Sequence, residues 1–363
     1  MKQKDTVVYP ELSAREKARK NKILSDSVRA VQINPGITVA DLLDQMSGMS
    51  IQARNLGDCA QVLSKMMKDP DRPTVFLGLA GPLIAAGLRN VIRDLITGGY
   101  VDAVVSTGAI LYQDIYQARG FNHYKGTPAA DDAELRDLYI DRIYDTYVDE
   151  EAFWATDKWC GKVADELPPG NYSSRQYLDF VGSRLEDANS IVYQCHRLGI
   201  PVFSPALNDS SIGIGLTEHR HRNRPGSGGG ICIDSIQDNY ELTQIVIKSK
   251  KTAAIYVAGG VPKNYINDSI VMSYIFGLQR GHSYAIQITT AVVLDGGLSG
   301  STLGEARSWG KIKKDADFAM AWVEPSVSLP MLAAYLFERH PAPARPRLRF
   351  DWDRDILKKL TTT

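Results

Sequence analysis

Several signatures of common protein classes are missing from these 363 residues. The chain has 42 basic residues (lysine plus arginine) and 42 acidic residues (aspartate plus glutamate), so its formal net charge is zero. It therefore has no excess of basic residues with which to bind nucleic acid. No apolar run reaches the roughly 18 residues of a membrane-spanning helix, because glycines and a proline interrupt the run from Val75 to Leu88. The first residues, MKQKDTVVYP, lack the apolar segment of a secretory signal. These absences predict a cytoplasmic protein that binds neither nucleic acid nor a membrane.

Residues that bind metals or form disulfides are scarce as well. The four cysteines, Cys59, Cys160, Cys195 and Cys232, are far apart in sequence and form no CxxC pair. We expect them to be reduced, buried thiols. His219 and His221 lie in a charged stretch, but no cysteine or carboxylate cluster accompanies them. The sequence therefore predicts no metal site.

Apolar segments alternate with amphipathic segments along most of the chain. Strands are expected at 74–80, 101–106, 201–204, 252–257, 283–289 and 316–323. Helices are expected at 40–49, 51–68, 82–97, 173–198, 233–250, 263–279 and 329–339. Strand–helix–strand units of this length favour a parallel sheet, so the pattern predicts an α/β fold with a doubly wound, mostly parallel sheet. Residues 1–50 are expected to form an N-terminal helical arm, residues 51–340 the main domain, and residues 341–363 an extended tail.

Small and polar residues follow five of the expected strands. The clusters are GLAGP (78–82), STGA (106–109), SPALNDSS (204–211), AGGVPKN (258–264), and TTA (289–291) with DGGLSG (295–300). Ligands of open α/β sheets bind beyond the carboxyl ends of the strands, glycine permits close backbone approach, and a helix N-terminus holds phosphate. Five clusters in register predict a nucleotide site, although none is a GxGxxG motif or a P-loop. Residues 226–230 (GSGGG) are interpreted as a flexible loop rather than a phosphate cradle.

The segment Ser308-Trp309-Gly310-Lys311 allows two interpretations. A lysine in such a position is more often solvated at the surface. A lysine beside an aromatic wall, however, is desolvated, and desolvation favours the neutral amine that acts as a nucleophile.

Longer segments of the chain resemble the deoxyhypusine synthase family. AGGVPKN, DGGLSGSTLGEARSWGKI (295–312) and EPSVSLP (324–330) are similar to that family's segments in order and spacing. Upstream, FLGLAGPLIAAGLRNVIRDLI (76–96), VDAVVSTGA (101–109) and PVFSPALNDSSIG (201–213) resemble its earlier strands. The likeness covers roughly residues 74 to 337, and the pattern is similar to the bacterial deoxyhypusine synthase-like, homospermidine-synthase-like branch.

The resemblance implies a Rossmann-like sheet, a homotetramer with active sites between subunits, and NAD as cofactor. It implies that NAD oxidises spermidine, that a lysine captures the aminobutyl group as an imine, and that an acceptor amine takes this group before NADH reduces the product. The matching lysine is Lys311. Trp309 would pack on the polyamine, and Glu305 would hold a terminal ammonium, with Asp268 as a further candidate. The residues matched to NAD binding are Gly78, Ala80, Gly81, Thr107, Gly108, Asp209, Gly259, Gly260, Thr290, Asp295 and Glu324.

The chain departs from the family at the positions that handle protons and the polyamine. Asn264 replaces a histidine that assists proton movement, and asparagine hydrogen-bonds but does not titrate near pH 7. Ile214 and Leu298 replace two aspartates that hold the far amine. Tyr112 and Gln113 replace two adjacent glutamates.

Because the similar branch is bacterial and bacteria generally lack the hypusine-bearing translation factor, a small amine acceptor is favoured. Putrescine as acceptor would yield homospermidine, and agmatine is a further possible donor or acceptor. Two alternatives remain open: a true deoxyhypusine synthase that modifies a protein lysine, and a non-catalytic protein that binds NAD or polyamines.

Overall fold

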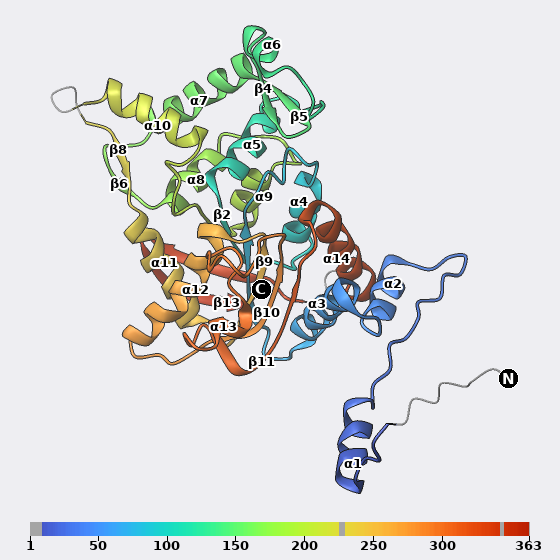
Figure 1. Ribbon diagram of the computed structural model, residues 1–363. Helices are drawn as coiled ribbons and strands as arrows, with labels where there is room; N and C mark the ends of the chain where they lie inside the picture. Colours follow the sequence, from blue (N-terminus) through green and yellow to red (C-terminus); the bar gives the residue numbers. More distant parts are fainter. Residues whose placement is uncertain (1–8, 225–228, 342–344, 363) are drawn as a thin grey trace.

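A computed structural model describes residues 9–224, 229–341 and 345–362. At its centre six parallel strands form one sheet (Figure 1). In spatial order they are β11 (Ile312–Ala321), β10 (His282–Ile288), β9 (Thr252–Val257), β1 (Thr74–Leu79), β2 (Ala103–Ser106) and β7 (Val202–Phe203). The α/β fold with a doubly wound, mostly parallel sheet is therefore confirmed.

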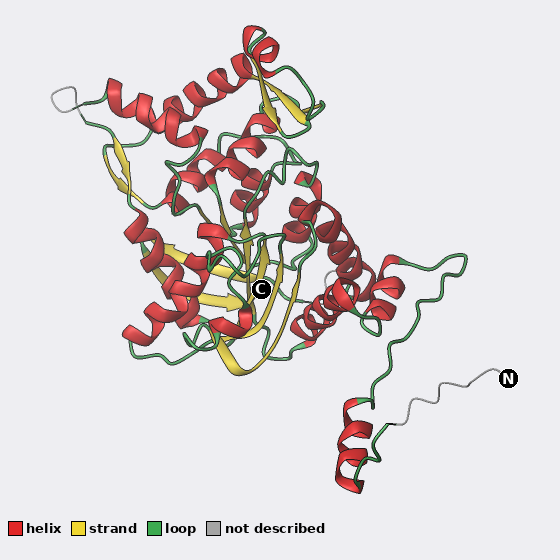
Figure 2. Ribbon diagram, in the orientation of Figure 1, coloured by secondary structure: helices red, strands yellow, loops and turns green. Residues whose placement is uncertain are grey.

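Helices cover both faces of this sheet (Figure 2). In β1, Val75 and Leu77 belong to one apolar core, whereas Phe76 belongs to the other. The first core contains residues of α3 (Ile51–Lys68), α4 (Arg89–Thr97), α9 (Ile191–Leu198) and α14 (Pro325–Arg339). The second contains residues of α11 (Ser235–Lys248), α12 (Gly260–Ile275) and α13 (Leu303–Ala306). Burial on both faces explains why β1, β2 and β9 are buried along their whole length rather than alternating, whereas β11 at the edge of the sheet carries charged residues.

A second group of elements lies beyond one end of the sheet, at the top of Figure 1. Its helices are α5 (Gly108–Ala118), α6 (Asp132–Asp137), α7 (Glu150–Asp165), α8 (Ser174–Gly182) and α10 (Ser211–Arg222). Its strands are β3 (Tyr124–Lys125), β4 (Ile140–Ile143) and β5 (Thr146–Asp149), which form an antiparallel sheet, and β6 (Gly170–Tyr172) with β8 (Ile231–Ile233), which pair in parallel. We predicted no element between residues 107 and 172, so α5, α6 and α7 were missed together with the strands there. Strands of two to four residues are too short to show a period.

The N-terminal residues contain two helices in different surroundings. α1 (Ala14–Ile23) has no buried residue and projects away from the main body (Figure 1). α2 (Val39–Met46) packs on α3 and α14, and the main-chain N–H of Ala40 donates to the carboxylate of Glu338 at 3.0 Å.

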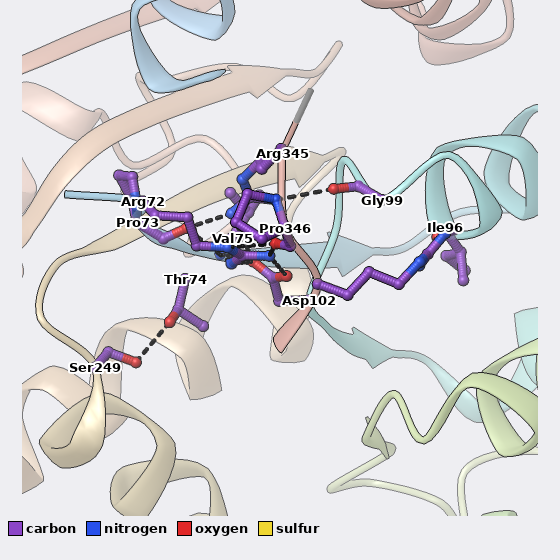
Figure 3. A network of polar contacts seen from close by, with 11 residues as sticks. Arg72, Pro73, Thr74, Val75, Ile96, Gly99, Asp102, Ser249, Arg345 and Pro346 are labelled. Carbon is purple, nitrogen blue, oxygen red and sulfur yellow. Dashed lines mark hydrogen bonds and ion pairs between the residues drawn. The ribbon is translucent and has the colours of Figure 1, made fainter. Parts of the chain in front are cut away.

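The C-terminal residues 345–362, here named the C-terminal strap, end in the antiparallel hairpin of β12 (Leu348–Asp353) and β13 (Ile356–Thr362). The strap is fastened to the sheet at Asp102, just before β2 (Figure 3). This buried carboxylate accepts hydrogen bonds from Arg72 and Arg345, each at 2.7 Å, and from the N–H of Val75 at 2.8 Å. Burial alone would raise the pKa of Asp102, but the guanidinium groups of Arg345 and Arg72 outweigh it, so this pKa lies below its ordinary value.

Some element boundaries differ from those predicted. The helix expected at 82–97 begins only at Arg89, because Gly81 and Gly87 adopt positive φ angles of 89° and 86° and Pro82 lies between them. The helix expected at 173–198 is two helices, and Ser190 caps the second through the N–H of Tyr193.

Other expectations concern single residues and the surface. Three cysteines are buried and free, but Cys232 is exposed on β8, so the prediction of buried thiols is wrong for that residue. Residues 226–228 of the expected flexible loop lie outside the described residues. Within the described ranges, no helix has the length and apolar character needed to cross a membrane.

Candidate active site

Three helices begin just beyond the carboxyl edge of the sheet: α5 follows β2, α10 follows β7, and α12 follows β9. Their N-cap residues, Thr107, Ser210 and Gly259, make no side-chain capping hydrogen bond. Capping does not follow the edge alone, since side chains cap α8, α11 and also α14, which follows β11, whereas α3 begins elsewhere without a side-chain cap. A helix start without a cap leaves N–H groups and the positive end of the helix dipole available to an anion. This edge therefore has the properties of a phosphate site.

Two of these helix starts touch each other. A Cβ placed on Gly108 would lie 2.3 Å from the Oγ of Ser210 and 3.1 Å from the carbonyl oxygen of Leu207. Only glycine permits this approach, which brings the starts of α5 and α10 together.

Ten of the eleven residues predicted to bind the cofactor lie beyond the carboxyl ends of the six strands. They are Ala80 and Gly81 after β1, Thr107 and Gly108 after β2, Asp209 after β7, Gly259 and Gly260 after β9, Thr290 and Asp295 after β10, and Glu324 after β11. Because all six strands are parallel, these residues share one edge of the sheet. Gly78 differs, since it lies inside β1, where a Cβ would meet Ile266 of α12 at 3.1 Å.

Two of these ten residues also have local structural contacts. The carboxylate of Glu324 accepts from the N–H of Ser326 at 2.8 Å and caps α14. The Oδ1 of Asp295 accepts from the N–H of Gly297 at 2.8 Å and closes a turn.

The connection between β10 and α13, residues 289–302, folds over the start of α12 and is here named the β10–α13 loop. A Cβ on Gly259 would lie 2.6 Å from the Cα of Ser299, and the N–H of Gly260 donates to the Oγ of Ser299 at 3.0 Å. The amide of Gln287 donates to the carbonyl oxygens of Ala258, at 2.7 Å, and Ser299, at 2.9 Å. The loop is therefore attached to the end of β9 and to the start of α12 through several contacts.

Four predicted residues form a second cluster, here named the amine pocket: Lys311, Asn264, Asp268 and Trp309. The Nζ of Lys311 lies 3.2 Å from the Oδ1 of Asp268 and 3.3 Å from the Oδ1 of Asn264. The amide of Asn264 donates to the Oδ2 of Asp268 at 2.8 Å. The Nζ of Lys311 also lies 5.5 Å from the centre of the Trp309 ring. A lysine, a carboxylate and an aromatic ring thus meet at one point.

The amine pocket is built by one helix and one strand start. Lys311 precedes β11, whereas α12 runs back over the sheet and carries Asn264 and Asp268, one helical turn apart, to that place. Tyr274, also on α12, donates to the carbonyl oxygen of Gly310 at 2.8 Å, and Gly310 has a φ of +71°. The turn before Lys311 is therefore held by the same helix that bears its partners.

Trp309 and Glu305 are more open to solvent than Lys311. The side chain of Lys311 is 15% exposed, whereas Trp309 is 65% exposed and Glu305 is exposed at the surface of α13. Lys311 is thus mostly shielded from water, whereas the Trp309 ring beside it is largely open to solvent.

Lys263, which sequence reasoning did not single out, lies between the carboxyl edge and the amine pocket. It is one of the largest fully buried side chains, and its Nζ lies 2.5 Å from the carbonyl oxygen of Ser301, 3.0 Å from its Oγ and 3.3 Å from the carbonyl oxygen of Leu298. Burial lowers the pKa of Lys263 to about 8; Glu305 opposes this shift and Lys311 adds to it. The only sequence signal was its place in the segment AGGVPKN.

The positions that depart from the family pattern lie in different surroundings. Tyr112 is buried, with its hydroxyl donating to the carbonyl oxygen of Phe153 at 2.8 Å, and Gln113 accepts from the N–H of Ala85 at 3.1 Å. Leu298 lies in the β10–α13 loop and Ile214 on α10, and both are exposed. Because α10, which carries Ile214, lies away from α12 and β11 in Figure 1, the chain does not bring Ile214 to the amine pocket.

His219, considered above as a metal ligand, uses both ring nitrogens within the protein. Its Nδ1 lies 2.6 Å from the Oδ1 of Asp165, and its Nε2 accepts from the N–H of Ile231 at 3.0 Å. Among the described residues, no group of three or more histidine, cysteine, aspartate or glutamate side chains is arranged to hold a metal ion.

Comparisons with known proteins add to this geometry. The family model for deoxyhypusine synthase matches residues 41–336. A deoxyhypusine synthase-like protein of Chlorobaculum parvum is 43% identical over 326 residues, which cover 87% of this chain and 92% of that protein. "Probable deoxyhypusine synthase 2" of Methanosarcina mazei is 41% identical over 321 residues, which cover 87% of this chain and 91% of that protein. A solved structure assigned to a deoxyhypusine synthase of Entamoeba histolytica has a TM-score of 0.57 at 19% identity, covers 86% of this chain and 97% of its own, and supports the fold alone.

Proposed function

Because the chain belongs to the deoxyhypusine synthase family, which is a family of aminobutyl transferases, we propose that it is an NAD-dependent enzyme that transfers the aminobutyl group of a polyamine to a small amine through an imine on Lys311. The contact of the Lys311 Nζ with Asp268 and Asn264, at 3.2 and 3.3 Å, supports this proposal most directly. It places the candidate nucleophile beside a carboxylate that suits an ammonium substrate.

The carboxyl edge of the sheet suits NAD. The uncapped starts of α5, α10 and α12 would hold the pyrophosphate. Gly81 and Gly260, where a Cβ would meet no atom closer than 3.9 Å, would allow close approach of the backbone. When bound there, NAD would take a hydride from the donor amine and return it to the product imine. Asp295 and Asp209 are the carboxylates at this edge that could accept from ribose hydroxyls.

Lys311 performs the group transfer. In its neutral form, its amine adds to the imine carbon of the oxidised donor, and the bond from that carbon to the departing nitrogen breaks. With spermidine as donor, 1,3-diaminopropane leaves and takes the proton that Lys311 loses. The acceptor amine then displaces Lys311 in the same way, so the lysine is regenerated. The 15% exposure of Lys311 limits the access of water, which would otherwise hydrolyse the lysine imine.

Asp268 is the carboxylate best placed to hold a substrate ammonium. It is 40% exposed and lies beside Lys311, whereas Leu298 in the β10–α13 loop offers only an apolar surface. Trp309 would cover the methylene groups of the substrate. One carboxylate and an apolar wall suit a short diamine such as putrescine, or agmatine, as the acceptor that enters after 1,3-diaminopropane has left.

A homotetramer would complete this site. Exposed apolar side chains occur in both parts of the proposed site: Trp309 in the amine pocket, and Leu294, which is 98% exposed, in the β10–α13 loop. Exposed patches of this kind mark interfaces. A second copy packed here would cover Trp309 and could bring its own α10 residues to the pocket.

The proposal is tested by product analysis. The purified protein is incubated with NAD and spermidine, with or without a second amine, either putrescine or agmatine. The amines are then separated by chromatography and identified by mass spectrometry. We expect 1,3-diaminopropane and homospermidine in equal amounts when putrescine is present. Product that appears only with a lysine-bearing translation factor would instead favour a true deoxyhypusine synthase, the function that the name of the Methanosarcina relative suggests. NAD binding without any amine product would favour a non-catalytic binding protein.

A further inference from the structure

Lys263 is a buried cation whose partners all lie in one segment of the β10–α13 loop. An ammonium group has three N–H donors. Here three acceptors surround it: the carbonyl oxygen of Leu298 and the carbonyl and hydroxyl oxygens of Ser301. Among the described residues, no carboxylate forms an ion pair with Lys263. The side chain thus joins the first turns of α12 to the far end of a loop more than 30 residues later in the chain.

Burying an ammonium group without a carboxylate partner costs folding free energy, because the charge loses its hydration. A methionine has a similar length and would be buried without losing the hydration of a charge. The pKa of Lys263 reflects this cost, since burial lowers it to about 8. The burial of this ammonium is therefore best explained by the loop residues, Leu298 and Ser301, that its three N–H groups bind.

The loop that Lys263 holds lies between the two parts of the proposed site. It carries Thr290 and Asp295 beyond the carboxyl end of β10 and Leu298, whose carbonyl oxygen contacts Lys263, while Asn264, the neighbour of Lys263 in sequence, contacts Lys311. We propose that Lys263 is a positioning residue: its ammonium fixes residues 298–301 to α12, and so sets the distance between the cofactor side of the site and the amine of Lys311. This inference rests on the proposed function for its catalytic consequence, but the attachment itself can be tested without cofactor or substrate.

The structural arm uses hydrogen–deuterium exchange at neutral pH on the protein alone. In Lys263→Met, we expect peptides covering residues 291–301 to exchange at least tenfold faster, with residues 103–118 unchanged. Lys263→Arg, which keeps the charge and the donors, should restore part of the protection. Ser301→Ala removes one acceptor and should give an intermediate effect, which keeps the test decisive if Lys263→Met does not fold. Lys250→Met serves as the control, because Lys250 is exposed and pairs with Asp71. Unchanged protection of 291–301 in a folded Lys263→Met protein would overturn the proposal.

The catalytic part of the test measures steady-state kinetics. In Lys263→Met, we expect kcat for 1,3-diaminopropane release to fall at least 30-fold while KM for spermidine changes less than threefold, with partial rescue in Lys263→Arg. A raised KM with an unchanged kcat would show that Lys263 only supports substrate binding, and would also overturn the proposal. If the unmodified protein releases no 1,3-diaminopropane, the proposed function fails, whereas the exchange experiment still decides whether Lys263 holds the loop.

Discussion

At the scale of residues, the amine pocket depends on a short chain of contacts. Asn264 orients Asp268, and Asp268 faces Lys311. Asparagine in place of the family's histidine leaves no titrating group at that position. The carboxylate of Asp268 is thus the charged neighbour of Lys311 in the pocket, and we assign it the recognition of the substrate ammonium.

Replacing Asp268 with asparagine tests this assignment. Asp268→Asn preserves the shape of the side chain but removes the charge that would pair with a substrate ammonium. We expect the KM for putrescine to rise about tenfold or more, the scale of a lost charge-assisted hydrogen bond. The control is Asp317→Asn, which removes an exposed carboxylate on β11 that pairs with Lys65 of α3. An unchanged KM in Asp268→Asn would exclude this role.

At the scale of elements, the starts of α5 and α10 should act as one unit. Gly108→Ala forces a Cβ to within 2.3 Å of the Ser210 hydroxyl, so the two helix starts must separate. We expect NAD affinity, measured by calorimetry, to fall at least tenfold while the circular dichroism spectrum is preserved. Gly170→Ala is the matched control, because its Cβ would have only one ordinary contact, with Tyr172 at 3.7 Å. Equal NAD affinity in both variants would contradict a phosphate site at this edge.

The C-terminal strap depends on another single carboxylate. Asp102→Asn leaves the guanidinium groups of Arg72 and Arg345 without their buried partner (Figure 3), and breaking such a pair costs about 3–5 kcal/mol. We expect a fall of this size in the free energy of unfolding by urea at pH 7. Asp132→Asn, which breaks an exposed pair with Arg142, should cost under about 1 kcal/mol.

The pH dependence of this effect has a definite sign. The pKa of Asp102 is lowered in the folded protein, so its contribution to stability is present above the unfolded value of 3.8 and is lost as the pH falls through the folded value. The difference between the unmodified protein and Asp102→Asn should therefore be constant from pH 7 to pH 5 and shrink only below about pH 3.8. A difference that already declines between pH 7 and pH 5 would show that the pKa of Asp102 is not lowered.

At the scale of the whole molecule, assembly would close the site. The exposed Leu294 lies in the loop that also carries Asp295, so an interface there would reach the cofactor residues. We expect Leu294→Glu to shift the mass measured by light scattering from a tetramer toward smaller species. Leu138→Glu, at an exposed leucine that follows α6, should leave the mass unchanged. A monomer in the unmodified protein would contradict the tetramer.

Much of the main domain could be predicted from the sequence, for a physical reason. A strand buried on both faces, such as Thr74–Leu79, is apolar throughout. Such a strand can be recognised from the sequence pattern alone. The break between α8 and α9 was missed because both helices are amphipathic and the connecting residues 183–190 contain no glycine or proline to mark it. The small sheet of β3, β4 and β5 was missed because its strands are very short.

The candidate site residues were named from the family resemblance rather than from spacing, since Asn264 and Lys311 stand 47 residues apart in the sequence. Lys311 and Trp309 stand in one short segment, and Asn264 and Asp268 lie one helical turn apart. The role of Lys263 depends on Leu298 and Ser301, which approach it only through the fold of the β10–α13 loop. Sequence alone likewise could not show that α10 lies away from the amine pocket.

The central claim is that Lys311 forms an imine with the donor amine, and a reductive trap tests it most directly. The protein is incubated with NAD and, separately, spermidine, putrescine and agmatine, then reduced with borohydride and weighed intact. We predict a mass gain of one aminobutyl group with spermidine that maps to Lys311 and is absent in Lys311→Ala. No adduct with any of the three amines, in a protein that still binds NAD, would contradict the account.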